Sequence, residues 1–98
     1  MSQEHHIELE ETADGGSHYV EFEGTRAARI LWTTIPEGID IKSTAADESM
    51  RGTGIARKLV EKTVALAKER NWKIRATCPY ANKVISGNED FAKLLLAD

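Results

Sequence analysis

The apolar residues of this 98-residue chain change their spacing near two glycines, Gly52 and Gly54. Before these glycines, apolar and polar residues alternate in short runs that turn residues separate, a pattern typical of half-buried strands. After them, from Ile55 to Glu69, apolar residues recur every three or four positions, which predicts one long amphipathic helix. A chain of this length builds one hydrophobic core, so we expect a single α/β domain over residues 1–98, with residues 1–6 flexible.

The other elements follow from the same kind of pattern. Four antiparallel strands are expected before the helix, over residues 7–10, 19–22, 27–34 and 39–44, with turns at 14–17 and 36–38. A fifth strand is expected at residues 72–78, ended by Pro79, and the helix before it indicates a crossover to a parallel neighbour. Residues 80–85 and 89–96 have helical spacing, and Asn88 is placed to cap the last helix. The sequence therefore predicts a mostly antiparallel sheet with one long amphipathic helix and short C-terminal helices.

Charge and cysteine content exclude several classes of function. The chain has 13 Lys and Arg against 16 Asp and Glu, a net charge of −3, so it lacks the basic excess of a nucleic-acid binder. Its single cysteine, Cys78, cannot form an internal disulfide, which suits a reducing cytoplasm. The sequence has no secretory leader and no run of about 18 apolar residues, so we expect no membrane partner and a cytoplasmic location. We expect no metal. His5 and His6 are assigned to a mobile start and His18 to a turn, and the three histidines do not have the spacing of metal ligands.

The segment from Met50 to Ala56 joins the last antiparallel strand to the long helix. Two glycines at such a junction let several backbone amides point the same way, and the helix N-terminus adds about half a positive charge, so a phosphate or pyrophosphate fits there. A Cβ on Gly54 would occupy the space of the phosphate oxygens. The spacing fits neither a P-loop, which requires Gly-Lys-Ser/Thr, nor a dinucleotide-binding fold, whose glycines follow the first parallel strand. The alternative is that Gly52 and Gly54 only relax a tight turn.

The order of the elements, together with two motifs, resembles a known family. Strands lead into Arg51-x-x-Gly54-x-Ala56, and an amphipathic helix and a further strand follow. The motif is similar to the signature Gln/Arg-x-x-Gly-x-Gly/Ala of the GNAT superfamily of N-acetyltransferases. With Leu59-Val60 and Cys78-Pro79-Tyr80 at the expected separation, residues 7–96 resemble the small stand-alone YjdJ-type branch. The resemblance implies the GNAT-like acyl-CoA N-acyltransferase fold.

The resemblance also implies transfer of an acetyl group from acetyl-CoA to an amine, either a protein lysine or amino terminus or a small amine. It assigns the pyrophosphate of acetyl-CoA to the backbone amides of the loop residues Arg51, Gly52, Thr53, Gly54, Ile55 and Ala56. The pantetheine arm is expected between strand 39–46 and strand 74–78, which splay apart, where it adds hydrogen bonds like an extra strand. The thioester is then expected near Cys78.

Cys78 is the candidate catalytic side chain. A thiol beside a thioester can accept the acetyl group by exchange and pass it on, provided that its pKa is lowered. Alternatively, Cys78 is a small buried residue at a strand end and the acetyl group passes directly to the amine. Asp47 and Glu48 are expected to be exposed to solvent. The weaker alternative is that one of them acts as the base that deprotonates the amine.

Two departures from the family pattern keep other functions open. The family often has histidines at the end of the strand before the loop and before the last helix, where this chain has Ser43-Thr44-Ala45-Ala46 and Asn88. A second candidate function is therefore a module that binds coenzyme A or an acylated partner without turnover. An RNA-binding module is a third class, which the net charge and the glycine spacing disfavour.

Overall fold

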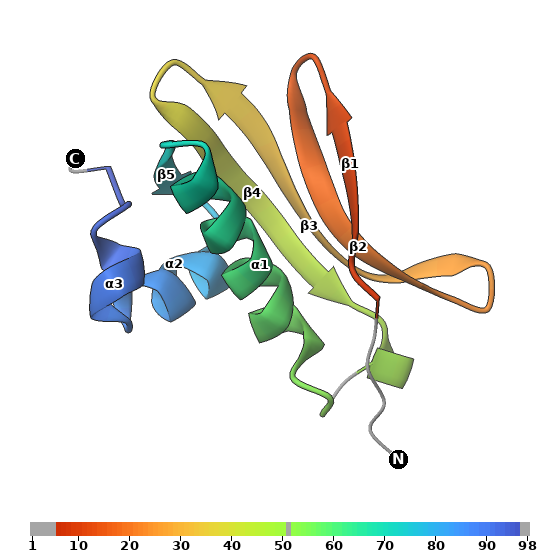
Figure 1. Ribbon diagram of the computed structural model, residues 1–98. Coiled ribbons are helices and arrows are strands. Elements are labelled where there is room, and N and C mark those ends of the chain that lie inside the picture. Colours follow the sequence, from red (N-terminus) through yellow and green to blue (C-terminus); the bar gives the residue numbers. More distant parts are fainter. Residues whose placement is uncertain (1–5, 51, 97–98) are drawn as a thin grey trace.

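A five-stranded sheet forms one layer of the protein. The computed structural model describes residues 6–50 and 52–96, so residues 1–5 of the predicted flexible start and Arg51 of the predicted loop lie outside it. The strands are β1 (Glu8–Thr12), β2 (Gly15–Phe22), β3 (Thr25–Ile35), β4 (Gly38–Ala46) and β5 (Lys73–Ala76). They lie in the order β1-β2-β3-β4-β5, with the first four antiparallel and β5 parallel to β4. The predicted mostly antiparallel sheet and the parallel crossover are confirmed (Figure 1).

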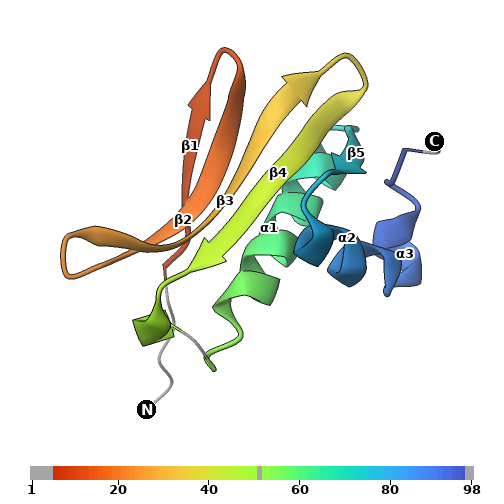
Figure 2. The same ribbon diagram turned by 180° about the vertical axis from the view of Figure 1, so that it is seen from behind.

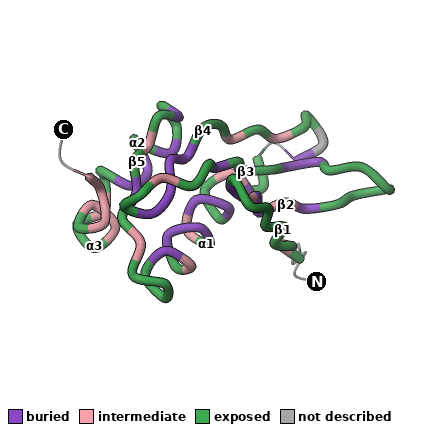
Figure 3. The backbone as a smooth tube through the Cα atoms, turned by 90° about the horizontal axis from the view of Figure 1, so that it is seen from above, coloured by how far each residue is buried: buried purple, intermediate pink, exposed green. Residues whose placement is uncertain are grey.

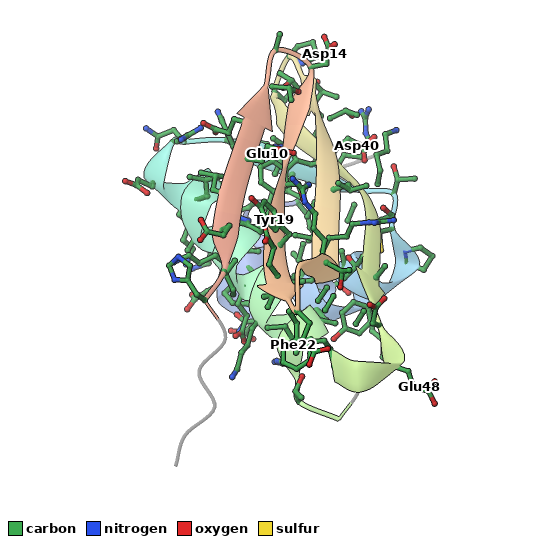
Figure 4. All side chains as sticks on the ribbon, turned by 90° about the vertical axis from the view of Figure 1, so that its right-hand side faces the viewer. Glu10, Asp14, Tyr19, Phe22, Asp40 and Glu48 are labelled. Atoms are coloured by element: carbon green, nitrogen blue, oxygen red, sulfur yellow. The ribbon has the colours of Figure 1, made fainter. Side chains whose placement is uncertain are left out.

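The helices pack on one face of this sheet and leave the other face uncovered. They are the short 3-10 turn η1 (Glu48–Met50), the long helix α1 (Ile55–Glu69), and the short helices α2 (Pro79–Ser86) and α3 (Glu89–Ala92). Figures 1 and 2 show α1 against the sheet with α2 and α3 beside it, and Figure 4 shows the uncovered face. The helix α1 has the bounds that the apolar spacing predicted.

The core lies between α1 and the covered face of the sheet. In β3, buried apolar residues alternate with exposed ones because successive side chains point to opposite faces. Ile30 of β3 and Ile41 of β4 are fully buried. The stripe of α1 that meets them consists of Ile55, Leu59, Val60, Thr63, Val64 and Ala67. Figure 3 shows the buried segments gathered where α1 crosses the sheet. Fully burying one such aliphatic side chain contributes about 1.5–3 kcal/mol, so this contact is the main source of stability.

The predicted turn at residues 14–17 is wrong. The hairpin turn is tighter, and β2 already begins at Gly15, so that His18 lies inside a strand and is only 2% exposed. The strand positions of Gly15 and Gly16 require glycine, because a Cβ on either would collide with Trp32. In the case of Gly16 the Cβ would lie 2.6 Å from the indole ring. Close approach of the Trp32 backbone at Gly15 and of the Trp32 indole at Gly16, rather than a turn, requires these two glycines.

The C-terminal elements are shorter than predicted. Strand β5 ends at Ala76 rather than at residue 78, and α3 ends at Ala92 rather than at residue 96. The chain after α3 instead runs along the outer edge of β5: the Ile74 amide donates to the Leu94 carbonyl at 2.7 Å, and the Leu96 amide donates to the Ile74 carbonyl at 2.8 Å. This pairing satisfies the amide and carbonyl of Ile74 at the edge of β5, which another helical turn of α3 would not do. The predicted cap is confirmed, since the Asn88 side chain accepts from the amides of Asp90 and Phe91.

Candidate functional site

The loop between η1 and α1 has the conformation that only glycine adopts readily. Gly52 has a φ of 80° and Gly54 a φ of 76°, both in the left-handed region. A Cβ on either glycine would meet no heavy atom of the described chain within 4 Å. The space beside both glycines is therefore open.

The first turn of α1 presents free backbone donors to this space. The Ile55 amide donates to the Thr53 hydroxyl oxygen at 3.2 Å, and the Thr53 hydroxyl donates to the Met50 carbonyl, which fixes the loop. The first bond of the helix ladder runs from the Lys58 amide to the Gly54 carbonyl at 3.1 Å. Among residues 6–50 and 52–96, the amides of Ala56 and Arg57 have no hydrogen-bond partner. These amides and the helix dipole make the turn suitable for an anion.

A cavity of about 230 Å³ lies at this turn. It is lined by Ala46, Met50, Gly52, Gly54, Ile55 and Ala56. Four of the six predicted loop residues therefore share one cavity, while Thr53 braces the loop and Arg51 lies outside the described residues. Asp47 and Glu48 are exposed, as predicted.

The strands β4 and β5 separate in the middle of β4. Their parallel pairing ends at Ile41 and Ala76, and the Cys78 amide adds one further bond to the Ile41 carbonyl at 2.9 Å. Beyond this point Pro79 begins α2, whereas β4 continues to Ala46 paired only with β3. The edge of β4 from Lys42 to Ala46 is thus left without a strand partner on the β5 side in the part of the chain that the structure describes. Figure 2 shows this divergence between β4 and the chain that leads into α2.

A buried carboxylate fixes the point of separation. Asp40 is 4% exposed, and its Oδ1 accepts from the Thr77 hydroxyl at 2.7 Å and from the Thr77 amide at 3.4 Å. The ammonium of Lys42 lies 3.0 Å from the other carboxylate oxygen. Burial opposes ionisation, but the hydrogen bonds from Thr77 and Lys42 outweigh it and lower the pKa of Asp40. This clamp was missed from the sequence, because an Asp between two isoleucines of an alternating strand looks like an ordinary solvent-facing residue.

Cys78 lies at the separated strands, on the N-terminal side of α2. It is 5% exposed, and its Sγ lies 3.5 Å from Oγ1 of Thr44. Burial raises the pKa of the thiol, but hydrogen bonds from the Thr44 hydroxyl and from the Tyr80 and Ala81 amides outweigh burial, so the net pKa is lowered. The groups that lower the pKa come from β4 and α2, and the sequence pattern did not indicate them.

The loop cavity and Cys78 lie along the same stretch of β4. Thr44 contacts Cys78, and Ala46 lines the loop cavity. Two residues of strand span about 7 Å, so the loop cavity and the thiol lie close together along the unpaired edge of β4. The loop and Cys78 are joined by this edge rather than by direct contact.

His18 is a second buried titratable group, away from this edge. Its Nδ1 lies 2.8 Å from Oγ1 of Thr63 on α1, and its ring packs against Trp32. The Thr63 hydroxyl donates to the Leu59 carbonyl at 2.9 Å, so its oxygen accepts from Nδ1–H. Burial lowers the pKa of His18 to about 4, so the imidazole is neutral at pH 7. Cross-strand pairing places His18 opposite Ile30, which in turn lies opposite Thr44, so two strand spacings of roughly 10 Å separate His18 from the thiol's partner.

Two classes of site are absent from the described residues. Residues 6–50 and 52–96 contain no group of three or more His, Cys, Asp or Glu side chains that could hold a metal ion. None of the helices described, of which α1 is the longest, has the length and apolar character to cross a membrane.

Comparison with solved structures shows the fold. A GCN5-like protein from Staphylococcus aureus shares 23% identity and a TM-score of 0.68, covering 93% of this chain and 89% of its own. The ribosomal-protein-alanine N-acetyltransferase of Brucella melitensis biovar Abortus 2308 shares 19% identity with a TM-score of 0.61, and the match covers 89% of this chain but 65% of that protein. A further GNAT-family protein from Staphylococcus aureus subsp. aureus shares 24% identity with a TM-score of 0.57, over 67% of this chain and 56% of that one.

The sequence also matches a family model. No curated protein matches the chain. The model of GCN5-related N-acetyltransferases, however, matches residues 17–94, which include the glycine loop, the separated strands and Cys78. This match confirms the resemblance to the GNAT superfamily, while the narrower YjdJ-type resemblance stays a prediction. The chain belongs to the GCN5-related N-acetyltransferase family.

Proposed function

We propose that this protein transfers an acetyl group from acetyl-CoA to an amine, with residues 51–56 binding the pyrophosphate. The observation that supports this most is the unpaired edge of β4, which runs from the loop cavity at Ala46 to the thiol beside Thr44. Family members use acetyl-CoA, and an extended pantetheine arm fits such an edge in the way that an added strand does. The open space at Gly52 and Gly54 suits phosphate oxygens.

The transfer is proposed to pass through Cys78. The Cys78 thiolate attacks the carbonyl carbon of the thioester, the bond from that carbon to the coenzyme A sulfur breaks, and coenzyme A leaves as a thiolate that takes up a proton. A neutral amine then attacks the acetyl group on Cys78, loses a proton, and releases the Cys78 thiolate. The hydrogen bonds from Thr44 and the α2 amides support the thiolate in both steps. The acceptor is a protein lysine or amino terminus, or a small amine.

The test of the loop compares two glycines of similar backbone conformation. Gly24, in the hairpin between β2 and β3, has a φ of 81° and open space around its Cβ position, like Gly54. Asn tolerates the left-handed region far better than a β-branched residue does, so Gly54→Asn fills the open space with less backbone strain than Gly54→Val. We expect Gly54→Asn to weaken acetyl-CoA binding, measured by calorimetry, on the order of tenfold or more, and Gly24→Asn to leave it unchanged. Equal affinities in both variants and the wild type would assign Gly54 to the turn alone.

The test of Cys78 is a single-turnover experiment. On incubation with acetyl-CoA and no acceptor, intact-protein mass spectrometry should detect one acetyl group, located at Cys78, and Cys78→Ala should abolish both the adduct and the turnover. An unmodified Cys78 in a protein that still acetylates amines would establish direct transfer. Binding of acetyl-CoA without adduct or turnover, over a panel of amines followed by release of free thiol, would instead support the alternative of a non-catalytic binding module.

A further inference from the structure

A second cavity lies between the start of α1 and the side of α2. Its volume is about 300 Å³, and it is lined by Arg57, Tyr80, Lys83, Val84 and Gly87. Figures 1 and 2 agree that α2 lies alongside the half of α1 that follows the loop. The α2 residues that line it follow the helical spacing of one face, so the cavity is a groove between two helices.

The charges of this cavity favour an anion. The Arg57 guanidinium pairs with Glu61 through Nε at 3.3 Å, and its two terminal nitrogens have no partner among the described residues. Lys83 forms no ion pair within residues 6–50 and 52–96. A chain with a net charge of −3 thus places two cations, and no carboxylate, in the wall of one cavity.

The position of the cavity relates it to the loop. Arg57 follows Gly54 by three residues, so it stands about 4.5 Å further along the axis of α1. The loop amides account for the two phosphates of a pyrophosphate. Coenzyme A carries a third phosphate, on the 3′ position of the same ribose that carries the pyrophosphate, so this group stays close to the pyrophosphate of a ligand seated at the loop.

We infer that Arg57 and Lys83 bind the 3′-phosphate of coenzyme A, an assignment that rests on the proposed function of the loop. The free terminal nitrogens of a guanidinium match two phosphate oxygens, and an ammonium adds a point charge. These two residues make the protein select coenzyme A over nucleotides that lack the 3′-phosphate.

The experiment compares two cofactors that differ only in this phosphate. Calorimetry with coenzyme A and dephospho-coenzyme A should show roughly tenfold tighter binding of coenzyme A to the wild-type protein. The double variant Arg57→Gln, Lys83→Gln should lose this preference while keeping its affinity for dephospho-coenzyme A. Adenosine 3′,5′-bisphosphate should likewise bind the wild-type protein more tightly than AMP, which lacks only the 3′-phosphate. The preference should weaken with added salt, because both cations are exposed.

The matched control is Lys58→Gln, which removes a cation from the neighbouring position of α1 without altering the wall of the cavity. It should keep the preference for coenzyme A. Loss of the preference in this control would mean that general charge, not the cavity, discriminates between the cofactors, and would overturn the inference. Equal affinity of the wild-type protein for both cofactors would overturn it too, and would leave the loop assignment intact. Absence of binding by either cofactor would overturn the loop assignment and this inference together.

Discussion

His18 and Cys78 are both buried and titratable, and both have a lowered pKa, yet the causes are opposite. At His18, between β2 and α1, burial favours the uncharged imidazole and lowers the pKa to about 4, with the charge of Lys62 acting in the same direction. At Cys78, where β4 and β5 separate, burial opposes the charged thiolate, and hydrogen bonds from Thr44 and two α2 amides favour it more strongly. The His18 environment therefore stabilises a neutral group, and the Cys78 environment stabilises an ion.

This difference shows which of the two groups is suited to chemistry. A neutral imidazole with Nδ1 engaged by Thr63 is a packing group at neutral pH. Hydrogen bonds to the ionised form of the thiol favour the nucleophilic role that we propose for Cys78. The direction of a pKa shift is thus not enough to assign function, because the favoured protonation state decides what the group can do.

The largest expected effect is a loss of stability in acid through His18. An unfolded chain binds a proton at this histidine near pH 6.5, while the folded protein binds it only near pH 4. Stability is therefore complete above pH 6.5 and falls as the pH drops toward 4. The shift from 6.5 to about 4 corresponds to a loss of about 2 kcal/mol by pH 5 and about 3 kcal/mol by pH 4 in the free energy of unfolding. Urea unfolding between pH 7 and pH 5 measures this loss. The pKa of Asp40 is lowered, so its carboxylate titrates below this pH range and does not contribute.

Variants of two histidines sharpen this test. His18→Phe keeps an aromatic ring beside Trp32, and the Thr63 hydroxyl retains its bond to the Leu59 carbonyl, so we expect a folded protein without the acid-dependent loss. His6→Gln replaces a histidine whose side chain is 82% exposed and should leave the loss unchanged. Besides Lys62, the charges that act on His18 are those of Glu11 and Arg70, which oppose each other. An unchanged slope in His18→Phe would contradict the assignment.

The fold could be predicted further than the site could. Alternation in β1 to β4, the apolar stripe of α1 and the crossover to β5 follow from hydrophobic spacing, and they were predicted because one buried face imposes a regular period. The predicted end of α3 was wrong because the edge of β5 pairs with the segment after α3. A pairing between residues distant in sequence overrides local helical spacing, and no local pattern contains it.

The glycine loop was found from the sequence because its residues are contiguous. Gly52 and Gly54 lie where the spacing of apolar residues changes from that of strands to that of a helix, and this change is visible in the sequence alone. The Asp40–Thr77 clamp and the His18–Thr63 pair join residues from different elements, so only the folded chain brings them together. His18 was assigned to a turn because Gly15 and Gly16 look like turn residues, whereas in the structure the close approach of Trp32, through its backbone at Gly15 and its indole at Gly16, requires them.

The smallest expected effect comes from removing the Thr44 hydroxyl, which is part of what distinguishes the environment of Cys78 from that of His18. Thr44→Val is nearly isosteric and removes the hydroxyl that lies 3.5 Å from the Cys78 sulfur, so the pKa of the thiol should rise. One such hydrogen bond is typically worth about 1 kcal/mol, so the rate of Cys78 alkylation by iodoacetamide at neutral pH should fall about fivefold. Ser43→Ala, at the adjacent position, where the side chain points to the other face of the sheet, should not change the rate. If Thr44→Val and the wild-type protein react with the same pH profile, the backbone hydrogen bonds from Thr44, Tyr80 and Ala81 support the thiolate, and the Thr44 hydroxyl has no part in distinguishing Cys78 from His18.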